Sequence, residues 1–257
     1  MQEETEIVMI KEVEAPEAEK TSAPLTVPHA IIWNALIIAA AILCAAMIIA
    51  RGQFTGGERA ADQKDQGSAV SVDIKNVKME GAPYVGSATA KVAIAYWSDF
   101  QCPFCKQFET TTFQEIFKEY VVTGKAVVVF KDFSFLGPDS TTAALYSRAV
   151  WELYPEQYFT WREAMYVAQD AEHSGFGDEP SVLKLTGTIS GIDAVKVQKQ
   201  VLARGDAYQA MLDADRTEAV AMGIQGTPSV IMGTTLVPGV ASFDSFKKLI
   251  DAELKKK

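Results

Sequence analysis

The chain has 257 residues, a formal net charge of −9, 48% hydrophobic residues and 10% aromatic residues. This length fits one or two domains, and the apolar content is ample for a folded core. The acidic balance excludes the basic surface by which proteins bind nucleic acid, so no nucleic-acid partner is expected. The sequence also contains no internal repeat and no glycine-rich phosphate-binding loop.

The first 50 residues predict a polar tail followed by a membrane anchor. Residues 1–29 hold seven Glu, two Lys and three Pro, a composition typical of disorder. Residues 30–50 are apolar apart from Asn34. As a helix they would extend about 31 Å, enough to cross a hydrocarbon core of ~30 Å. A cleaved signal peptide would need a basic start and a shorter apolar core. An uncleaved transmembrane helix is therefore the favoured interpretation.

The remaining chain predicts a linker and one folded domain. Residues 51–69 are polar and glycine-rich, as flexible linkers are, and the domain is expected over 70–257. Apolar periodicity predicts the following elements: strands at about 91–97 and 126–131, a helix at 103–122 between them, helical stretches at 141–151, 156–168, 181–187 and 193–222, strands near 229–232 and 235–239, and a last helix at 242–255. This order predicts an α/β fold with a helical insertion.

Cys102-Pro103-Phe104-Cys105 holds the two cysteines outside the apolar segment, where Cys44 is interpreted as a packing residue. Proline at the first helical position marks a helix start, so Cys102 is expected at the N-cap. The free N–H groups and dipole of a helix N-terminus favour a thiolate there. Cys105 comes one turn later on the same helix face, so the two sulfurs can meet. The motif predicts an attacking Cys102 and a recessed, resolving Cys105.

Three other interpretations of this cysteine pair are less favoured. A structural disulfide closing a loop of about four residues would stabilise the domain by only ~2 kcal/mol. Structural zinc takes about four ligands, whereas this region offers two cysteines and the distant His173. Two unrelated buried thiols would not explain the Pro-Phe spacer. A redox-active pair is the preferred hypothesis.

A second motif, Gly226-Thr227-Pro228-Ser229, directly precedes the apolar run Val230-Ile231-Met232. Proline is tolerated at the start of a strand because no N–H is needed there, and an X–Pro bond can be cis at modest cost. Alone the motif predicts an ordinary turn. Its weight comes from its position, about 125 residues after Cys102 and directly before a short hairpin.

The two motifs together carry a family resemblance. The segments YWSDFQCPFC (96–105), GIQGTPS (223–229) and VPG (237–239) resemble the DsbA-like branch of the thioredoxin superfamily, including its membrane-anchored bacterial members. The resemblance covers about residues 70–254. It implies a thioredoxin fold with a helical insertion, and disulfide exchange on extracytoplasmic substrates. It also implies a cis peptide before Pro228, packed against the Cys102–Cys105 pair.

The resemblance also implies how clients bind. The backbone of Thr227 is expected to pair with a substrate strand, as in β-augmentation. Phe104, Trp97 and Pro228 are expected to form an apolar rim, with Trp97 as a plain core residue the alternative. Neither a metal nor a separate cofactor is expected, because the redox-active Cys102–Cys105 disulfide itself carries the electrons.

One position departs from the family pattern. The family often has a carboxylate six residues before the first cysteine, where it takes the proton of the resolving thiol. Here that position is Tyr96. Asp99 is nearer in sequence but is expected in the loop, and Lys131 and Asp132 at a strand end are candidate substitutes. A slower resolution step, or a route through water, is the expectation.

Direction, partners and location follow from the same resemblance. The Pro103-Phe104 spacer favours an oxidase, with a reductase, an isomerase or a non-catalytic binding module as alternatives. Residues 52–69 are too short for the dimerisation domain of the dimeric isomerases, so a monomer is expected.

Oxidases act where disulfides persist, so 1–29 is placed in the cytoplasm and 70–257 outside it. The expected partners are reduced or unfolded extracytoplasmic proteins and a membrane reoxidising protein of DsbB-like or VKOR-like type.

Overall fold

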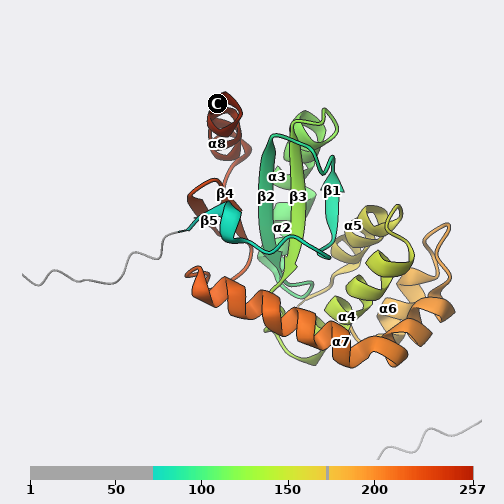
Figure 1. The fold of residues 1–257 in the computed structure, drawn as a ribbon. Helices are drawn as coiled ribbons and strands as arrows, with labels where there is room; N and C mark the ends of the chain where they lie inside the picture. Colours follow the sequence, from blue (N-terminus) through green and yellow to red (C-terminus); the bar gives the residue numbers. More distant parts are fainter. Residues whose placement is uncertain (1–71, 172–173, 257) are drawn as a thin grey trace, which may run out of the picture. The chain divides into compact units, whose positions relative to one another are not determined.

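A five-stranded mixed sheet lies at the centre of the computed structural model, which describes residues 72–171 and 174–256. Its strands are β1 (Tyr84–Gly86), β2 (Val92–Ser98), β3 (Ala126–Asp132), β4 (Ser229–Met232) and β5 (Thr235–Pro238). Their order is β1-β3-β2-β4-β5 (Figure 1). Strands β2 and β3 pair in parallel, whereas every other neighbouring pair is antiparallel. The sheet places β4 directly beside β2, and this brings the two sequence motifs together.

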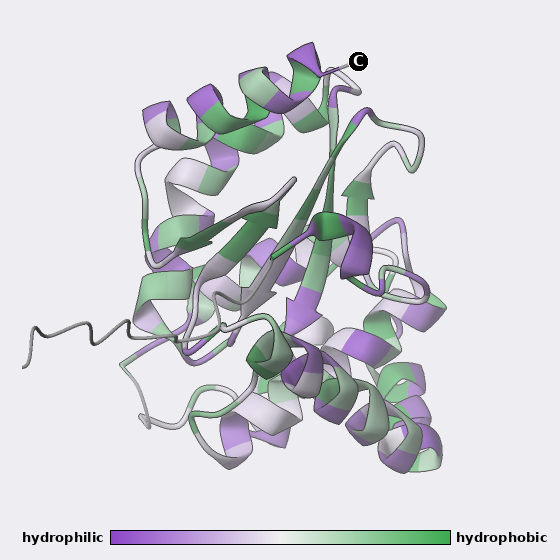
Figure 2. Ribbon diagram, turned by 60° about the vertical axis from the view of Figure 1, so that its left-hand side comes forward, coloured by the Kyte–Doolittle hydropathy of each residue, from purple (hydrophilic) through white to green (hydrophobic). Residues whose placement is uncertain are grey.

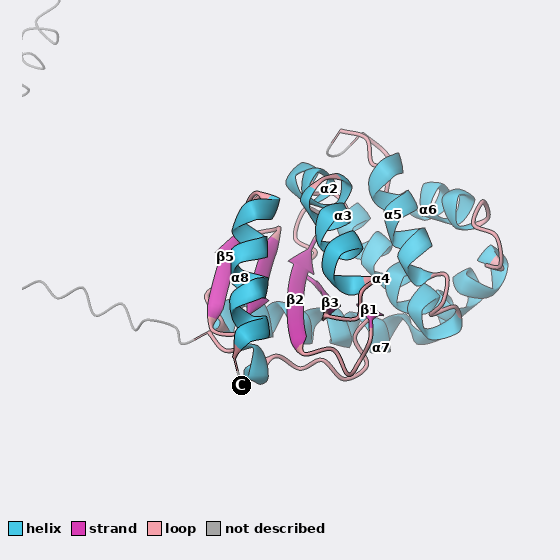
Figure 3. Cartoon of the chain, turned by 90° about the horizontal axis from the view of Figure 1, so that it is seen from above, coloured by secondary structure: helices cyan, strands magenta, loops and turns pink. Residues whose placement is uncertain are grey.

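Helices cover both faces of this sheet (Figures 1 and 3). The helical elements are the 3-10 turn η1 (Ile74–Asn76), α2 (Pro103–Thr110), α3 (Thr112–Ile116), the π-helical turn η2 (Phe117–Val121), α4 (Pro138–Leu153), α5 (Tyr158–Ala168), α6 (Glu179–Thr186), α7 (Ala194–Ala221) and α8 (Phe243–Lys255). Helices α2, α3 and α8 pack on one face. The C-terminal end of α7 packs with η1 on the other. Helices α4, α5, α6 and the start of α7 pack on one another as the insertion.

The two central strands form because their sequences are apolar almost throughout. In β2 (VAIAYWS) six of the seven residues are buried, and in β3 (AVVVFKD) all seven are. Near-continuous apolar runs are typical of strands covered on both faces. Figure 2 shows the strands mainly in the hydrophobic colours, with hydrophilic residues distributed over the helices. Because successive side chains alternate, Tyr96 points to the α2 side and Trp97 to the α7 side.

The predicted elements of the domain are confirmed except for the first helix, and two short elements were not predicted. The helix expected over 103–122 is instead the series α2, α3 and η2, because the helix breaks at Thr111 (φ −124°, ψ −92°). The hydroxyls of Thr110 and Thr111 bond back to the carbonyls of Lys106 and Gln107, at 2.8 and 2.6 Å, a competition that disfavours continued helix. The edge strand β1 and the turn η1, of three residues each, were not predicted, since they are too short to show a periodic pattern.

The expected tail (1–29), anchor (30–50) and linker (51–69) lie outside the residues that the structure describes. Within 72–171 and 174–256, none of the helices combines the length and the apolar character needed to cross a membrane.

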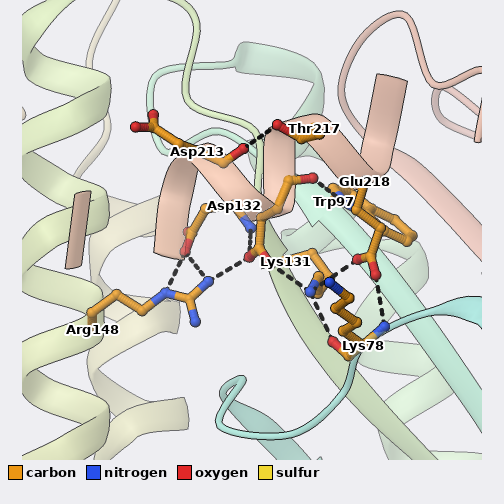
Figure 4. Close-up of polar contacts among 9 residues, drawn as sticks. Lys78, Trp97, Lys131, Asp132, Arg148, Asp213, Thr217 and Glu218 are labelled. Atoms are coloured by element: carbon orange, nitrogen blue, oxygen red, sulfur yellow. Dashed lines mark hydrogen bonds and ion pairs between the residues drawn. The ribbon is translucent and has the colours of Figure 1, made fainter. Parts of the chain in front are cut away.

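A buried network of charges joins the sheet to the insertion (Figure 4). Lys131 Nζ at the end of β3 lies 2.5 Å from Asp215 Oδ1 and 3.0 Å from Glu218 Oε2, both on α7. Arg148 Nε of α4 donates to Asp132 Oδ2 at 2.6 Å, and the same guanidinium contacts Asp215. Lys131 and Asp132 are therefore both committed to ion pairs. Neither residue therefore replaces the family carboxylate, although the sequence analysis had named both as candidates.

Asp215 is the shared acceptor of this network, so its loss should be costly. We expect Asp215→Ala to lower the free energy of unfolding by about 1.5–3 kcal/mol, because Lys131 and Arg148 each lose one buried acceptor while keeping Glu218 and Asp132. The matched control is Asp213→Ala, an exposed carboxylate two residues earlier on the same helix, which should cost less than about 0.5 kcal/mol. Urea unfolding followed by circular dichroism measures both. Equal losses in the two variants would contradict the assignment.

Candidate active site

Cys102 lies at the N-cap of α2, as predicted. Its backbone is extended (φ −77°, ψ 119°), and Pro103 occupies the first helical position. Its carbonyl accepts the first helical hydrogen bond, from Lys106 N at 3.1 Å, and its N–H donates to the carbonyl of Asp99 at 3.1 Å. The sulfur therefore faces the N-terminal end of the helix, where negative charge is stabilised. Both cysteines are free thiols in the structure.

The buried carboxylate of Asp99 organises the loop that leads to Cys102. Asp99 Oδ1 accepts from Gln101 N at 2.8 Å and from Ser140 Oγ at 2.7 Å. Asp99 Oδ2 accepts from the backbone N–H groups of Phe135 and Leu136 at 2.9 and 3.2 Å. Asp99 thus lies in the loop, as expected, and it ties this loop to the start of α4. Its structural role was not apparent from the sequence.

The second motif lies against the first, as the resemblance implied. The Thr227–Pro228 peptide bond is cis, and the thiol of Cys102 donates to the carbonyl of Thr227 at 3.4 Å. A cleft of about 390 Å³ beside this loop is lined by residues that include Thr227, Pro228 and Leu236. The two sequence motifs therefore form one site.

The predicted apolar rim is only partly present. Phe104, between the two cysteines, is 61% exposed. Pro228 is largely buried but lines the cleft. Trp97 is 0% exposed, and its indole N–H donates to the carbonyl of Asp215 at 3.3 Å on the other face of the sheet. The prediction that Trp97 contacts clients is therefore wrong. It is a core residue, because it follows Tyr96 in a strand that is covered on both faces.

The two thiols differ sharply in acidity. The pKa of Cys102 is lowered to about 6. The main cause is a hydrogen bond that its sulfur accepts from Cys105, and interactions with Thr227 and with the backbone N–H groups of the first helical turn contribute less. Cys105 is completely buried, and its pKa is raised well above the usual value, first by burial and then by the neighbouring Cys102. Near neutral pH, Cys102 is thus the thiolate and Cys105 the protonated partner, as an attacking and a resolving cysteine require.

A buried ion pair that the sequence analysis missed lies beneath α2. Arg162 of α5 donates through Nε to Glu109 Oε1 at 2.8 Å and through Nη2 to Ser98 Oγ at 2.9 Å. The guanidinium also lies over the ring of Phe130, 4.0 Å from its centroid. One signal could have indicated Glu109, since it follows Cys105 by four residues and so shares its helix face. Nothing local indicated Arg162, because it lies 53 residues further along the chain.

The insertion holds the active-site loop in place. Gln169, just after α5, donates from Nε2 to the carbonyls of Phe100 at 2.5 Å and Cys102 at 3.2 Å. Lys106 of α2 reaches back to the carbonyl of Gln169. The start of α2 is therefore fixed by contacts that the helical insertion supplies.

Comparison with known proteins agrees with this geometry. A family model described as Thioredoxin matches residues 78–252. The chain belongs to this thioredoxin family. It is 28% identical to the probable disulfide bond formation protein D of Bacillus anthracis over 173 residues, 67% of this chain and 78% of that protein. It is 26% identical to disulfide bond formation protein D of Bacillus subtilis strain 168 over 179 residues, 70% and 80% of the two chains.

Solved structures show the same fold. Oxidised BdbD from Bacillus subtilis matches with a TM-score of 0.66 at 24% identity, over 73% of this chain and 99% of that one. The thiol-disulfide exchange protein alpha-DsbA2 from Wolbachia pipientis matches with a TM-score of 0.59 at 25% identity, over 66% and 86%. The predicted thioredoxin fold with a helical insertion and the DsbA-like relationship are confirmed. The chain is a thiol:disulfide oxidoreductase.

The acidity of Cys102 predicts which thiol reacts first. In the reduced protein, iodoacetamide should label Cys102 before Cys105, with a rate that falls as pH drops through about 6, because the lowered pKa keeps Cys102 a thiolate only above that pH. Mass spectrometry of quenched samples locates the label. Preferential labelling of Cys105, or a midpoint for Cys102 at the ~8.5 of a free thiol, would show that the roles are assigned wrongly.

Proposed function

We propose that this protein is a membrane-anchored oxidase that introduces disulfide bonds into extracytoplasmic proteins. The observation that supports this direction most strongly is the lowered pKa of Cys102, about 6, beside a buried Cys105. Whatever stabilises the Cys102 thiolate stabilises the reduced enzyme, and so makes its disulfide a stronger oxidant. The names of the Bacillus relatives, disulfide bond formation protein D, agree with an oxidase.

The reaction requires two thiolate exchanges. A client thiolate attacks the sulfur of Cys102 in the Cys102–Cys105 disulfide, and a mixed disulfide forms while Cys105 leaves with the electron pair. A second client thiolate then attacks the client sulfur of the mixed disulfide, and Cys102 leaves as a thiolate. The client gains one disulfide, and the cysteine pair gains two electrons. In this scheme the electrons pass only between thiols and disulfides.

The client is proposed to lie across the cis-proline loop. There its backbone pairs with Thr227, adding a strand as in β-augmentation. Phe104 and the cleft lined by Pro228 offer apolar contact to an unfolded segment. Recognition through backbone and general apolar contact suits an enzyme that accepts many reduced clients.

Anchoring at the membrane is supported by the sequence of residues 30–50, whose apolar length matches a bilayer. The linker over 51–69 would give Cys102 reach along the surface. The reduced enzyme then needs a membrane partner that takes its two electrons, for which a quinone-linked protein of DsbB-like or VKOR-like type is proposed. The enzyme would act as a monomer at the extracytoplasmic side.

Turnover on a reduced, unfolded client tests the proposed direction. With a chemical oxidant present in excess, the purified protein should restore activity to reduced ribonuclease far faster than the oxidant alone, because Cys102 relays the oxidation. Cys102→Ser should abolish the acceleration, whereas Cys44→Ser, at the third cysteine of the chain, should leave it intact. A protein that reduces the native client faster than it oxidises the unfolded one would contradict an oxidase.

Protease protection tests the proposed location. In intact spheroplasts, added protease should digest the CxxC domain and spare a tag placed at the N-terminus, because 70–257 would face outward and 1–29 the cytoplasm. Lysed spheroplasts, in which both sides become accessible, are the control. Protection of the CxxC domain in intact cells would place it in the reducing cytoplasm, where a reductase is the better assignment.

A further inference from the structure

The hydroxyl of Tyr96 is a buried polar group with no partner. The Tyr96 side chain is completely buried, and its hydroxyl makes no hydrogen bond in the described part of the structure. Its ring packs edge-on against Phe108, with centroids 5.0 Å apart, and near Phe113 and Phe130 at 6.2 Å. A phenylalanine would make these contacts equally well. Since buried polar groups are rarely left unpaired, the hydroxyl requires another explanation.

Tyr96 lies close to the resolving cysteine. Both residues belong to the same core cluster, and Phe108, which touches the Tyr96 ring, follows Cys105 by three residues on α2. The pKa of Tyr96 is raised well above its usual value, first by burial and then by Cys105. The phenol therefore keeps its proton whenever Cys105 reacts. The phenol can therefore serve as a hydrogen-bond donor on this side of Cys105, but not as the acceptor of its proton.

Other groups near Cys105 are already engaged. The neighbours that shift the pKa of Cys105 are Cys102, the backbone of Asp99 and the side chain of Thr227, and Cys105 in turn raises the pKa values of Tyr96 and Tyr166. The Tyr166 hydroxyl donates to the carbonyl of Asp99 at 3.4 Å, and the Glu109 carboxylate behind the pair is held by Arg162. Among the buried side-chain hydroxyls of the described residues, those of Tyr96 and Thr227 make no hydrogen bond.

We propose that Tyr96 donates a hydrogen bond to the Cys105 thiolate when the active-site disulfide opens. The inference rests on the proposed oxidase direction, in which a client thiolate bonds to Cys102 and the bond between Cys102 and Cys105 breaks. The electron pair of that bond goes to the sulfur of Cys105, and the Tyr96 proton stays on its oxygen. A leaving thiol with a lower pKa leaves faster. Here a hydrogen-bond donor stabilises the leaving sulfur at the position where the family often has a proton-accepting carboxylate.

Titration of Cys105 alone tests the proposal without any client. In a Cys44→Ser, Cys102→Ser background, Cys105 is the one remaining cysteine, and the ¹³Cβ chemical shift of labelled cysteine reports its ionisation. Tyr96→Phe should raise the pKa of Cys105 by about one unit or more, the effect of losing a hydrogen bond to a charged group. The matched control is Tyr158→Phe. It removes an equally buried hydroxyl that is bonded to Ser147 and should leave the titration unchanged.

A second measurement covers the case in which Cys105 titrates above the pH at which the protein stays folded. Reduction of the oxidised protein, with both active-site cysteines intact, by excess glutathione should be a few fold slower in Tyr96→Phe than in Tyr158→Phe. The melting temperature of reduced Tyr96→Phe should match that of the parent protein, because the Tyr96 hydroxyl makes no hydrogen bond in the reduced structure. An unchanged Cys105 titration or glutathione rate in Tyr96→Phe would overturn the proposal. Because neither test needs client turnover, failure of the oxidase assignment would be seen separately.

Discussion

The hydrogen bond between the Cys105 thiol and the Cys102 sulfur determines the chemistry of this site. It is the largest contribution to the lowered pKa of Cys102, and after burial it is the largest contribution to the raised pKa of Cys105. This contact and the burial of Cys105 together separate two chemically identical side chains into a thiolate and a protonated thiol. Their different exposure to the helix N-terminus and to solvent acts in the same sense.

That contact depends on where α2 begins. Pro103 at the first helical position and the Asp99 carboxylate in the preceding loop fix the start of the helix. The insertion then supplies Ser140 to Asp99 and Gln169 to the carbonyl of Cys102. The helical insertion is therefore part of the active site's support, although none of its side chains is assigned a chemical step. The buried Arg162 of the insertion, paired with Glu109 of α2, stabilises the same helix.

Much of this arrangement could be predicted from the sequence because the signals are local. The proline after Cys102 marks the helix start, and apolar spacing locates the helices of the insertion within a few residues. The orientation of β2 could not be predicted in this way. Its residues are apolar on both faces, so the sequence shows no alternation of polar and apolar residues. Without that alternation it could not be predicted that Tyr96 faces the cysteines and Trp97 faces α7. The partners of Glu109 and Asp215 were also hidden, because buried ion pairs join residues that are distant in sequence.

The reduction potential of the Cys102–Cys105 pair tests the stabilised thiolate most directly. Equilibration in glutathione buffers, followed by trapping of free thiols and mass spectrometry, gives its value. A thiolate with a pKa of about 6 at a helix N-terminus predicts an oxidising pair, with a potential at or above the ~−180 mV of protein disulfide isomerase and towards the ~−120 mV of DsbA. A value near the ~−270 mV of thioredoxin would contradict it and favour a reductase.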